Sequence, residues 1–426
     1  MIRWAAKCFG LSVFIAGGFC SSVLATIPVH VEYANNRYQL IRNGQPYFIK
    51  GAGGKKYFDR LAEYGGNSIR TWGTENAQSI LDEAEKLGLT VTLGLWMGHQ
   101  NHGFNYDNEL IVANQLERFR QDVLKYKDHP ALLMWSVGNE VNLNYSNVKV
   151  WDAVEDIAKM IAELDGRHPV MTVLAGAPKA DVQLIMQKCP HIEILGINSY
   201  AALPNIPDDL NNAGWNRPFI ITEWGPNGYW EVAATEWGAA LEQNSSEKSE
   251  TYLRRYEEVI SVNNDRNLGS YVFLWGDKRE VTPTWFGMFL DNGRETAMVD
   301  SVRYAWNGYW PENRSPEIGD LIMQDDPGNE AGVRLSPNTE YLFYVSLVDP
   351  DGDELSLGWT IQGERGGSSI GVGGQEISVD GNALVQGEEG IVQFRAPEKA
   401  GAYRLFVFGY DSHNHAATAN IPFIVD

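Results

Sequence analysis

The stretch WSVGNE at residues 135–140 is an apolar run that ends abruptly in a glutamate, and IITEWG at residues 220–225 repeats this pattern later in the chain. An uninterrupted apolar run of this kind is typical of a strand that is buried on both faces. A glutamate directly after such a strand lies at its carboxyl end, where (β/α)8 barrels carry their functional side chains. The two stretches therefore predict a barrel in which Glu140 and Glu223 lie at the same end.

Strand-like runs alternate with amphipathic helical stretches along most of the chain. The predicted strands are residues 47–52, 67–72, 90–96, 131–137, 170–174, 192–198, 219–222 and 269–274, and the clearest helical stretches are 77–87, 114–126, 150–164 and 248–262. Eight strands, each followed by a helix, are the repeat of a (β/α)8 barrel. A doubly wound open sheet is the alternative architecture. We favour the barrel because GAGG at residues 51–54 lacks the G-x-G-x-x-G spacing expected after the first strand of such a sheet.

The first 25 residues have the features of a secretory signal peptide. Arg3 and Lys7 give a positive start, residues 9–20 are apolar but too short to span a bilayer, and Val23-Leu24-Ala25 offers a cleavage site. We therefore expect residues 1–25 to be removed and the mature protein to be secreted or periplasmic. No later stretch of the sequence is apolar enough for a transmembrane helix, so we expect no membrane insertion after cleavage.

The rest of the chain divides into two predicted domains. The first domain, residues 26–312, contains a hairpin at 29–42 with asparagine-rich turns, and the barrel follows this hairpin. Residues 313–426 show short alternating strands, such as 341–347 and 402–408, separated by Gly, Pro and Asp turns. This pattern predicts a small immunoglobulin-like β-sandwich.

The chain is strongly acidic, with 34 Lys and Arg against 55 Asp and Glu and a formal charge of −21. Such a charge disfavours nucleic acids, anionic membranes and strongly acidic polysaccharides as partners. The sequence also contains 14 Trp, and indole rings stack on sugar rings, although they are ordinary core residues as well. We therefore expect a neutral oligosaccharide or polysaccharide as the substrate.

Two carboxylates in one cleft are the groups that glycoside hydrolysis requires. In the retaining reaction one carboxylate attacks the anomeric carbon, and the other protonates the leaving oxygen and then activates water, with about 5–5.5 Å between them. The fourth and seventh strands of a barrel lie across its mouth from each other, so Glu140 and Glu223 can face one cleft. This reaction needs no cofactor.

These residues resemble glycoside hydrolase clan A, the retaining β-glycosidases built on (β/α)8 barrels. In that clan an Asn-Glu pair ends the fourth strand and a glutamate ends the seventh, and Asn139-Glu140 and Glu223 match these positions. The resemblance implies that Glu140 is the acid/base, that Glu223 is the nucleophile and that Asn139 bonds the 2-hydroxyl of the sugar.

Further residues match at the ends of other strands. The resemblance implies that Arg70 keeps the nucleophile ionised, that Tyr200 donates a hydrogen bond to it, and that Trp275 forms an aromatic floor beneath the sugar. His99 follows the third strand, and we expect it to contact a sugar hydroxyl. A structural salt bridge for Arg70, and core packing for Tyr200 and Trp275, are the alternatives.

Other side chains near the strand ends are candidates for substrate contact. The tryptophans predicted to stack on sugar rings are Trp72, Trp96 and Trp224, for which core packing is the alternative. Lys278 and Arg279 follow the eighth strand and are either substrate contacts or ordinary surface charges.

Within the clan, the barrel resembles the catalytic domain of glycoside hydrolase family 2, although only a hairpin stands where that family usually has sandwich domains. FIKG at 48–51 and NSIR at 67–70 also resemble β-1,3-glucanosyltransferases. The first prediction is an exported retaining β-glycoside hydrolase acting on a neutral glycan, foremost a β-glucan. A transglycosylase that uses the same two glutamates and a non-catalytic glycan-binding barrel are the alternatives.

The sequence predicts no metal site. His99, His102 and Glu109 lack the tight spacing of zinc ligands. DPDGD at residues 349–353 clusters oxygen atoms that suit calcium, but it lacks the full spacing of a calcium loop. A plain turn is the first interpretation of this stretch.

Overall fold

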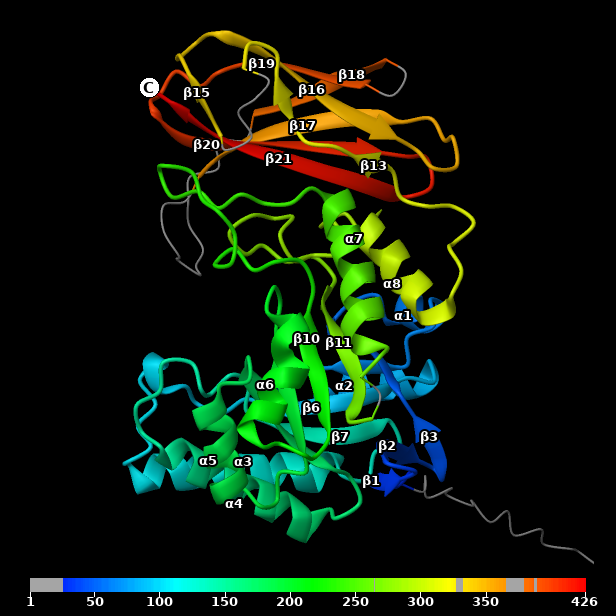
Figure 1. Cartoon of the computed structure of the whole chain (residues 1–426), viewed down its shortest axis with the longest axis vertical. Coiled ribbons are helices and arrows are strands. Elements are labelled where there is room, and N and C mark those ends of the chain that lie inside the picture. The colour runs from blue at the N-terminus through cyan, green and yellow to red at the C-terminus, as the bar shows by residue number, and fades with distance from the viewer. Residues whose placement is uncertain (1–25, 264, 327–331, 365–378, 387–388) are drawn as a thin grey trace, which may run out of the picture.

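A parallel barrel and, at one end of it, a stack of C-terminal β-strands make up the molecule (Figure 1). The computed structural model describes residues 26–263, 265–326, 332–364, 379–386 and 389–426. The predicted signal peptide, residues 1–25, lies outside this part of the chain. Among the helices of the described residues, none has the length and apolar character needed to cross a membrane.

Eight parallel strands close into a barrel, which confirms the predicted (β/α)8 fold. They are β4 (Ile49–Gly54), β5 (Ser68–Arg70), β6 (Thr90–Leu95), β7 (Leu132–Val137), β8 (Val170–Ala175), β9 (Ile194–Asn198), β10 (Phe219–Trp224) and β11 (Asn267–Trp275). Every residue of β6, β7 and β10 is buried, which explains why their sequences are continuous apolar runs. Because the strands are parallel, the residues at their carboxyl ends share one face of the barrel.

Helices connect the strands and cover the outside of the barrel. They are α1 (Phe58–Glu63), α2 (Ala77–Lys86), α3 (Glu109–Tyr126), α4 (Lys149–Leu164), α5 (Lys179–Lys188), α6 (Ile206–Ala213), α7 (Ser245–Arg255) and α8 (Ala297–Asn307). Two of them begin at a side-chain cap: Asn108 accepts from the backbone N of Ile111, and Asn244 forms a capping box with Glu247. These caps supply partners for N–H groups that the first turn of a helix leaves free.

A small antiparallel sheet precedes the barrel. Its strands are β1 (Val29–Ala34), β2 (Arg37–Arg42) and β3 (Gln45–Tyr47). Asn35 and Asn36 between β1 and β2 both have positive φ, as a tight hairpin turn requires. Leu40 packs in one cluster with Ile49 and Leu133, which lie near the starts of their strands. The sheet therefore covers the end of the barrel opposite the carboxyl ends of the strands.

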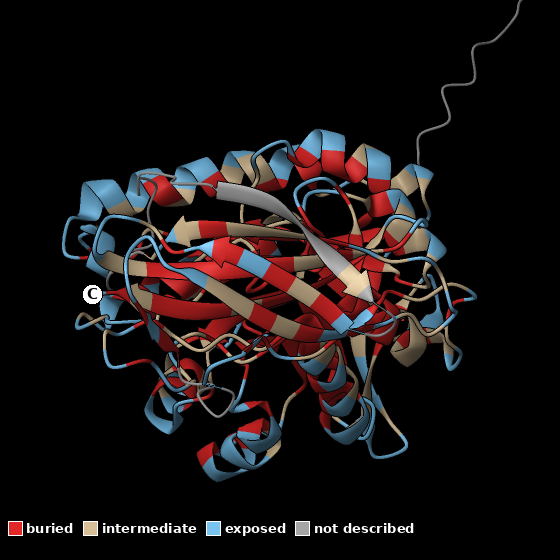
Figure 2. Cartoon of the chain, turned by 90° about the horizontal axis from the view of Figure 1, so that it is seen from above, coloured by how far each residue is buried: buried red, intermediate tan, exposed pale blue. Residues whose placement is uncertain are grey.

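The C-terminal strands form antiparallel sheets, as predicted. They are β13 (Glu317–Ile318), β14 (Ile322–Met323), β15 (Val333–Leu335), β16 (Glu340–Val348), β17 (Ser356–Gly363), β18 (Val379–Gln386), β19 (Glu389–Arg395), β20 (Gly401–Tyr410) and β21 (His415–Val425). The short strand β15 is the exception, because it runs parallel to β21. One layer contains β17, β20 and β21, the other contains β16 and β19, and β18 pairs with both β17 and β19. Buried and exposed positions alternate along several of these strands (Figure 2), because one face of each sheet packs on the core between the layers.

A buried polar interface joins the barrel to the sandwich. The short strand β12 (Glu295–Thr296), just before α8, pairs with β21. Arg404 of β20 is buried and donates to the carbonyl of Ala240 at 2.7 Å. On the barrel side, Lys248 of α7 pairs with Glu242 at 2.6 Å, and both side chains are buried. The sandwich therefore holds the far end of the segment that leads from β10 to α7.

Candidate active site

Glu140, the first of the two predicted glutamates, lies directly after β7. The backbone turns sharply here, since Gly138 has a φ of 72° and Glu140 a φ of 51°, a conformation that is costly for a residue with a side chain. The backbone N of Glu140 donates to the carbonyl of Val173 at 2.9 Å. Its carboxylate Oε1 accepts a hydrogen bond of 2.9 Å from Nδ2 of Asn198, the last residue of β9. The turn therefore brings the Glu140 carboxylate to a neighbouring strand end.

Glu223, the second predicted glutamate, lies within β10 and receives three side-chain hydrogen bonds. Its Oε1 accepts from Arg70 Nη1 at 2.8 Å and from Trp72 Nε1 at 2.7 Å. Its Oε2 accepts from the hydroxyl of Tyr200 at 3.0 Å. Arg70 and Glu223 are both buried, so this ion pair is shielded from solvent. Donors on both oxygens stabilise the negative charge of the carboxylate.

Asn139 connects the two glutamates. Its Oδ1 accepts from Nη2 of Arg70 at 2.6 Å, while Nη1 of the same guanidinium bonds Glu223. The Asn139 oxygen also accepts from Nδ2 of Asn198 at 3.2 Å, and that amide group donates to Glu140 as well. The ends of β5, β7, β9 and β10 therefore meet in one hydrogen-bond network.

The two carboxylates have different surroundings. Burial raises the pKa of Glu140 to about 7, and the negative charge of Glu223 acts in the same direction. The hydrogen bond from Asn198 and the charge of Arg70 oppose this rise. At neutral pH the Glu140 carboxyl can therefore both give and take a proton, whereas Glu223 is held by three donors. Acid–base and nucleophilic catalysis by two carboxyl groups need this division of roles.

Five aromatic residues, here called the aromatic wall, flank Glu223. The ring of Trp72 meets Phe273 edge-on with centroids 5.8 Å apart. Tyr200 packs against Phe286 at 5.5 Å and against Trp230 at 5.6 Å. Phe273 and Phe286 are buried, whereas Trp230 is 56% exposed. The wall therefore runs from the Glu223 carboxylate to the solvent.

Trp224, predicted to bind substrate, lies in the core instead. It is fully buried and packs against Tyr252 of α7 and Tyr256. Successive side chains of a strand point to opposite faces, so the residue after Glu223 is directed towards the surrounding helices. The prediction for Trp224 is therefore corrected: it is a core residue that packs the barrel against α7.

The predicted substrate contact of Trp275 is corrected in the same way. Trp275 is 1% exposed, and its ring stacks with Trp306 of α8 at 6.2 Å. The register of β11 against β4 shifts between Val272 and Trp275, so the alternation expected of a regular strand fails here. Phe273 is the aromatic residue of β11 that lies beside Trp72.

Trp96 and His99 form a stacked pair beside Asn139, with ring centroids 5.2 Å apart. Trp96 is 44% exposed and His99 is 8% exposed. Burial lowers the pKa of the His99 imidazole, the charge of His102 acts in the same direction, and a hydrogen bond with the backbone of Asn139 opposes them. Among the described residues, the buried Nε2 of His99 has no hydrogen-bond partner. These two predicted residues therefore lie at the edge of the network, and the indole of Trp96 is open to solvent.

The structure brings most of the predicted residues together and adds two. The residues gathered around the glutamates as predicted are Arg70, Trp72, Asn139, Glu140, Tyr200 and Glu223. Asn198 and Phe273 are the additions. A signal for Asn198 exists in the sequence, because it is a polar residue at the end of a buried strand, two positions before Tyr200.

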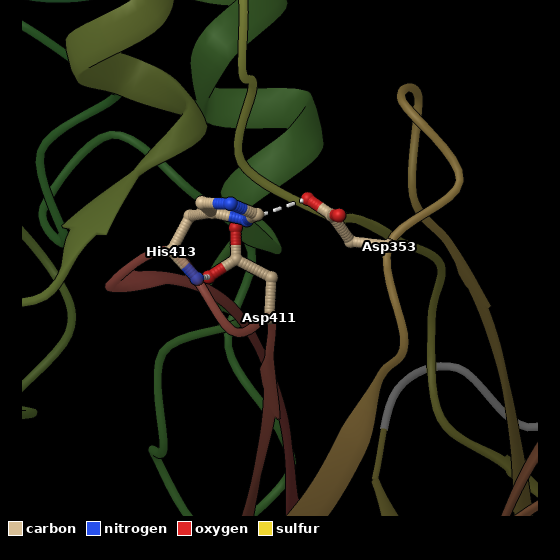
Figure 3. Close-up of side chains that lie close together, drawn as sticks. All are labelled: Asp353, Asp411 and His413. Atoms are coloured by element: carbon tan, nitrogen blue, oxygen red, sulfur yellow. Dashed lines mark hydrogen bonds and ion pairs between the residues drawn. The ribbon is translucent and has the colours of Figure 1, made fainter.

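Acidic and imidazole side chains gather in the C-terminal region, far along the chain from the glutamates. Among the described residues, Asp353, Asp411 and His413 are the group whose ligand atoms lie close enough together for a metal ion (Figure 3). His413 Nδ1 lies 2.9 Å from Asp353 Oδ2, and Asp411 Oδ1 accepts the backbone N–H groups of His413 and His415. These hydrogen bonds join the two loops that carry the cluster, and they explain why its side chains lie close together.

The stretch 349–353 is a turn that Asp349 stabilises. Its Oδ1 accepts from the backbone N of Asp351 at 2.9 Å and from that of Asp353 at 3.0 Å. Aspartate side chains that bond the backbone a few residues ahead are typical of turns. The geometry supports the plain-turn interpretation of this stretch.

Comparisons with known proteins point to one family. Residues 58–288 match the family described as glycosyl hydrolases family 2, TIM barrel domain. A β-glucuronidase of Paenibacillus borealis is 25% identical over 316 residues, which cover 63% of this chain and 51% of that protein. A β-galactosidase of Bacteroides ovatus is 24% identical over 202 residues, which cover 40% of this chain and 23% of that protein.

The similarity to solved structures supports the barrel fold. The crystal structure of a Ruminococcus gnavus β-glucuronidase superposes with a TM-score of 0.50 and 16% identity, covering 66% of this chain and 53% of that one. The chain spans about half or less of the length of the curated relatives it matches. The family match at residues 58–288 includes the glutamates and every residue that bonds them.

Proposed function

Because this chain belongs to glycosyl hydrolases family 2 through its TIM barrel domain, we propose that it is a retaining β-glycosidase with Glu223 as nucleophile and Glu140 as acid/base. The observation that carries the proposal is the contrast between the two carboxylates. Glu223 accepts three hydrogen bonds, one of them from a buried arginine. Burial and the neighbouring charge raise the pKa of Glu140 to about 7. Glu223 is therefore suited to attack, and Glu140 to proton transfer.

In the first step, an oxygen of Glu223 attacks the anomeric carbon and the bond from that carbon to the leaving oxygen breaks. Glu140 gives its proton to the leaving oxygen, so the leaving group departs as a neutral alcohol. The sugar is then joined to Glu223 through an ester bond. The guanidinium of Arg70 stays in place beside both Glu223 and Asn139.

In the second step, Glu140 is a carboxylate and takes a proton from a water molecule. The water oxygen attacks the anomeric carbon, the ester bond breaks, and Glu223 is released as a carboxylate. Two displacements at the same carbon give net retention of configuration. Throughout, the oxygen of Asn139 accepts from Arg70 and Asn198, so its NH2 group is the one that would donate to a sugar hydroxyl.

We propose a neutral β-linked glycan, foremost a β-glucan, as the substrate of an exported enzyme. The formal charge of −21 supports this choice, because an acidic polymer would be repelled. The aromatic wall beside Glu223 offers faces on which sugar rings can stack. The signal-like residues 1–25 support export.

The test is an incubation of the wild type and of Glu223→Gln with a panel of β-1,2-, β-1,3-, β-1,4- and β-1,6-linked oligoglucosides and matched mannosides. Shorter products from the wild type alone would support hydrolysis and give the linkage. Proton NMR of the first product then reads its anomeric configuration. An inverted anomer, or equal activity of the Glu223→Gln variant, would contradict the proposed double displacement.

Transglycosylation is the second candidate, and the exposed Trp230 favours it. Its ring meets Tyr200 edge-on at 5.6 Å, and the Tyr200 hydroxyl bonds Glu223. A second sugar stacked on this indole would lie near the covalent sugar and could replace water as the acceptor. Products longer than the starting oligomer in the same incubation would support transfer, and their absence at high substrate concentration would support hydrolysis.

A further inference from the structure

Two charged residues follow β11 and form an ion pair, and the first of them lies against the aromatic wall. Lys278 Nζ is 2.7 Å from Oε2 of Glu280, and it also lies over the ring of Phe273, 4.5 Å from its centroid. Their side chains are 34% and 18% exposed, so the pair is partly shielded but reachable from solvent. The ammonium group is therefore held between a carboxylate and an aromatic face.

Phe273 connects this ion pair with the proposed nucleophile. Its ring meets Trp72 edge-on at 5.8 Å, and the indole of Trp72 donates to Glu223. The same ring lies 6.1 Å from Tyr200, which donates to the other oxygen of Glu223. The Lys278–Glu280 pair therefore lies one aromatic layer away from the groups that hold Glu223.

The charge of Glu280 reaches Glu140, the proposed acid/base. It acts on Glu140 in the same direction as Glu223 does, and it also acts on Tyr229 of the loop after β10. Charges that are partly buried interact over longer distances than charges in water. Glu280 is therefore a third carboxylate in the electrostatic surroundings of the reacting groups.

Two cations of this region are already committed to partners. Arg70 bonds Glu223 and Asn139, and Lys278 is paired with Glu280. With Glu140 protonated for the first step, a sugar that carried its own carboxylate would still meet the negative charge of Glu280, and both cations would already be paired. A sugar with a neutral hydroxymethyl group would meet no such repulsion, and its hydroxyl could bond either member of the ion pair.

We propose that Glu280 is a specificity-determining residue: paired with Lys278 over the aromatic wall, it rejects sugars that carry a carboxylate and thereby selects neutral sugars. The inference rests on the proposed function, because it assumes that a sugar occupies the space next to Glu140 and Glu223. It adds to that function a named residue and the chemical group that this residue excludes.

Calorimetric binding of two iminosugars tests the proposal without requiring turnover. Isofagomine carries a hydroxymethyl group, and its uronic counterpart carries a carboxylate at the same position. Both have the same ring amine, so the ratio of their dissociation constants isolates the carboxylate. We expect the wild type to bind the neutral ring at least about tenfold more tightly, because partly buried like charges repel one another.

The decisive variant is Glu280→Gln, which keeps the shape of the side chain and removes its charge. We expect this variant to bind the uronic ring more tightly than the wild type does. The ratio of the two dissociation constants should therefore shrink by about fivefold or more. The matched control is Asp277→Asn in the same loop, whose carboxylate pairs with Lys56 instead. This control removes one negative charge as well and should leave the ratio unchanged. Glu280→Ala should reproduce the shift of Glu280→Gln.

Three results would overturn the inference: preference of the wild type for the uronic ring, an unchanged ratio in Glu280→Gln, or binding of neither ring by the wild type. Failure of the proposed function gives a different pattern. If the neutral ring binds with the expected preference but no glycan of the panel is cleaved or transferred, the role of Glu280 stands and the proposed reaction does not.

Discussion

Arg70 and Glu223 form a buried ion pair of 2.8 Å that joins the ends of β5 and β10, two strands that are not neighbours in the barrel. The same guanidinium bonds Asn139, so one cation is fixed with respect to both glutamates of the site. A guanidinium stays charged at any pH at which the protein is folded. The charge that stabilises Glu223 is therefore permanent, whereas the proton on Glu140 is exchangeable.

Removing the cation should cost both stability and activity. In Arg70→Gln the carboxylate of Glu223 would remain buried without its counter-charge, so we expect a loss of about 3–5 kcal/mol in the free energy of unfolding. Urea unfolding measures this loss. In the double variant Arg70→Gln with Glu223→Gln the buried charge is gone as well, and part of the loss should be recovered. Additive losses from the two single changes would contradict a direct pairing.

Replacing the proposed acid/base should affect substrates according to their leaving groups. Glu140→Gln cannot protonate a leaving oxygen, so we expect kcat/KM on an oligosaccharide to fall by about 10²–10⁴. An aryl glycoside with an acidic phenol as its leaving group needs no such proton, and its glycosylation step should be much less affected. Added azide should then restore turnover by replacing the water that Glu140 no longer activates. Equal losses on both substrates would assign Glu140 a structural role.

The raised pKa of Glu140 also predicts how stability changes with pH. The ordinary pKa of 4.5 rises to about 7 in the folded protein, through burial first and the charges of Glu223 and Glu280 in addition, against the charge of Arg70. The folded state therefore holds this proton more tightly than the unfolded state. The contribution of the protonated group is fully present below pH 4.5 and is lost as the pH rises through 7.

The matched variant isolates this contribution. The side chain of Glu140→Gln cannot ionise, so the variant does not lose this contribution as the pH rises. The free energy of unfolding of the variant relative to that of the wild type should therefore increase by about 3 kcal/mol from acid to mildly alkaline pH. Urea unfolding of both proteins at several pH values gives the difference. A difference that stays constant with pH would show that Glu140 ionises with its ordinary pKa in the folded state.

The barrel could be predicted because its strands are buried on both faces. Continuous apolar runs in β6, β7 and β10 indicate such strands, and the two glutamates stand near the carboxyl ends of β7 and β10. The roles of Arg70 and Tyr200 came from the resemblance to the clan, and their place at the ends of parallel strands agrees with it. Here the spacing along the chain carries the three-dimensional information.

The side chains that the sequence misplaced depend on local geometry that spacing does not encode. Trp275 follows a shift of register in β11, which moves it into the core and leaves Phe273 beside Trp72. The pairing of Lys278 with Glu280 depends on the path of a loop that has no periodicity. The sequence can therefore propose aromatic residues near strand ends as stacking candidates. Whether each side chain points to the site or to the core has to come from the structure.

Trp72 and Trp224 give a direct test of that distinction, because both were predicted to bind substrate and the structure separates them. Trp72→Phe keeps the ring but loses the hydrogen bond to Glu223, so we expect kcat/KM to fall by roughly 10–100-fold, in line with about 1.5–3 kcal/mol for a bond to a charged group. The indole nitrogen of Trp224 has no hydrogen-bond partner among the described residues. Trp224→Phe should therefore lower the free energy of unfolding by about 1–3 kcal/mol through lost packing and leave kcat/KM within about twofold. A larger effect of Trp224→Phe on kcat/KM than on stability would show that this side chain reaches the substrate after all.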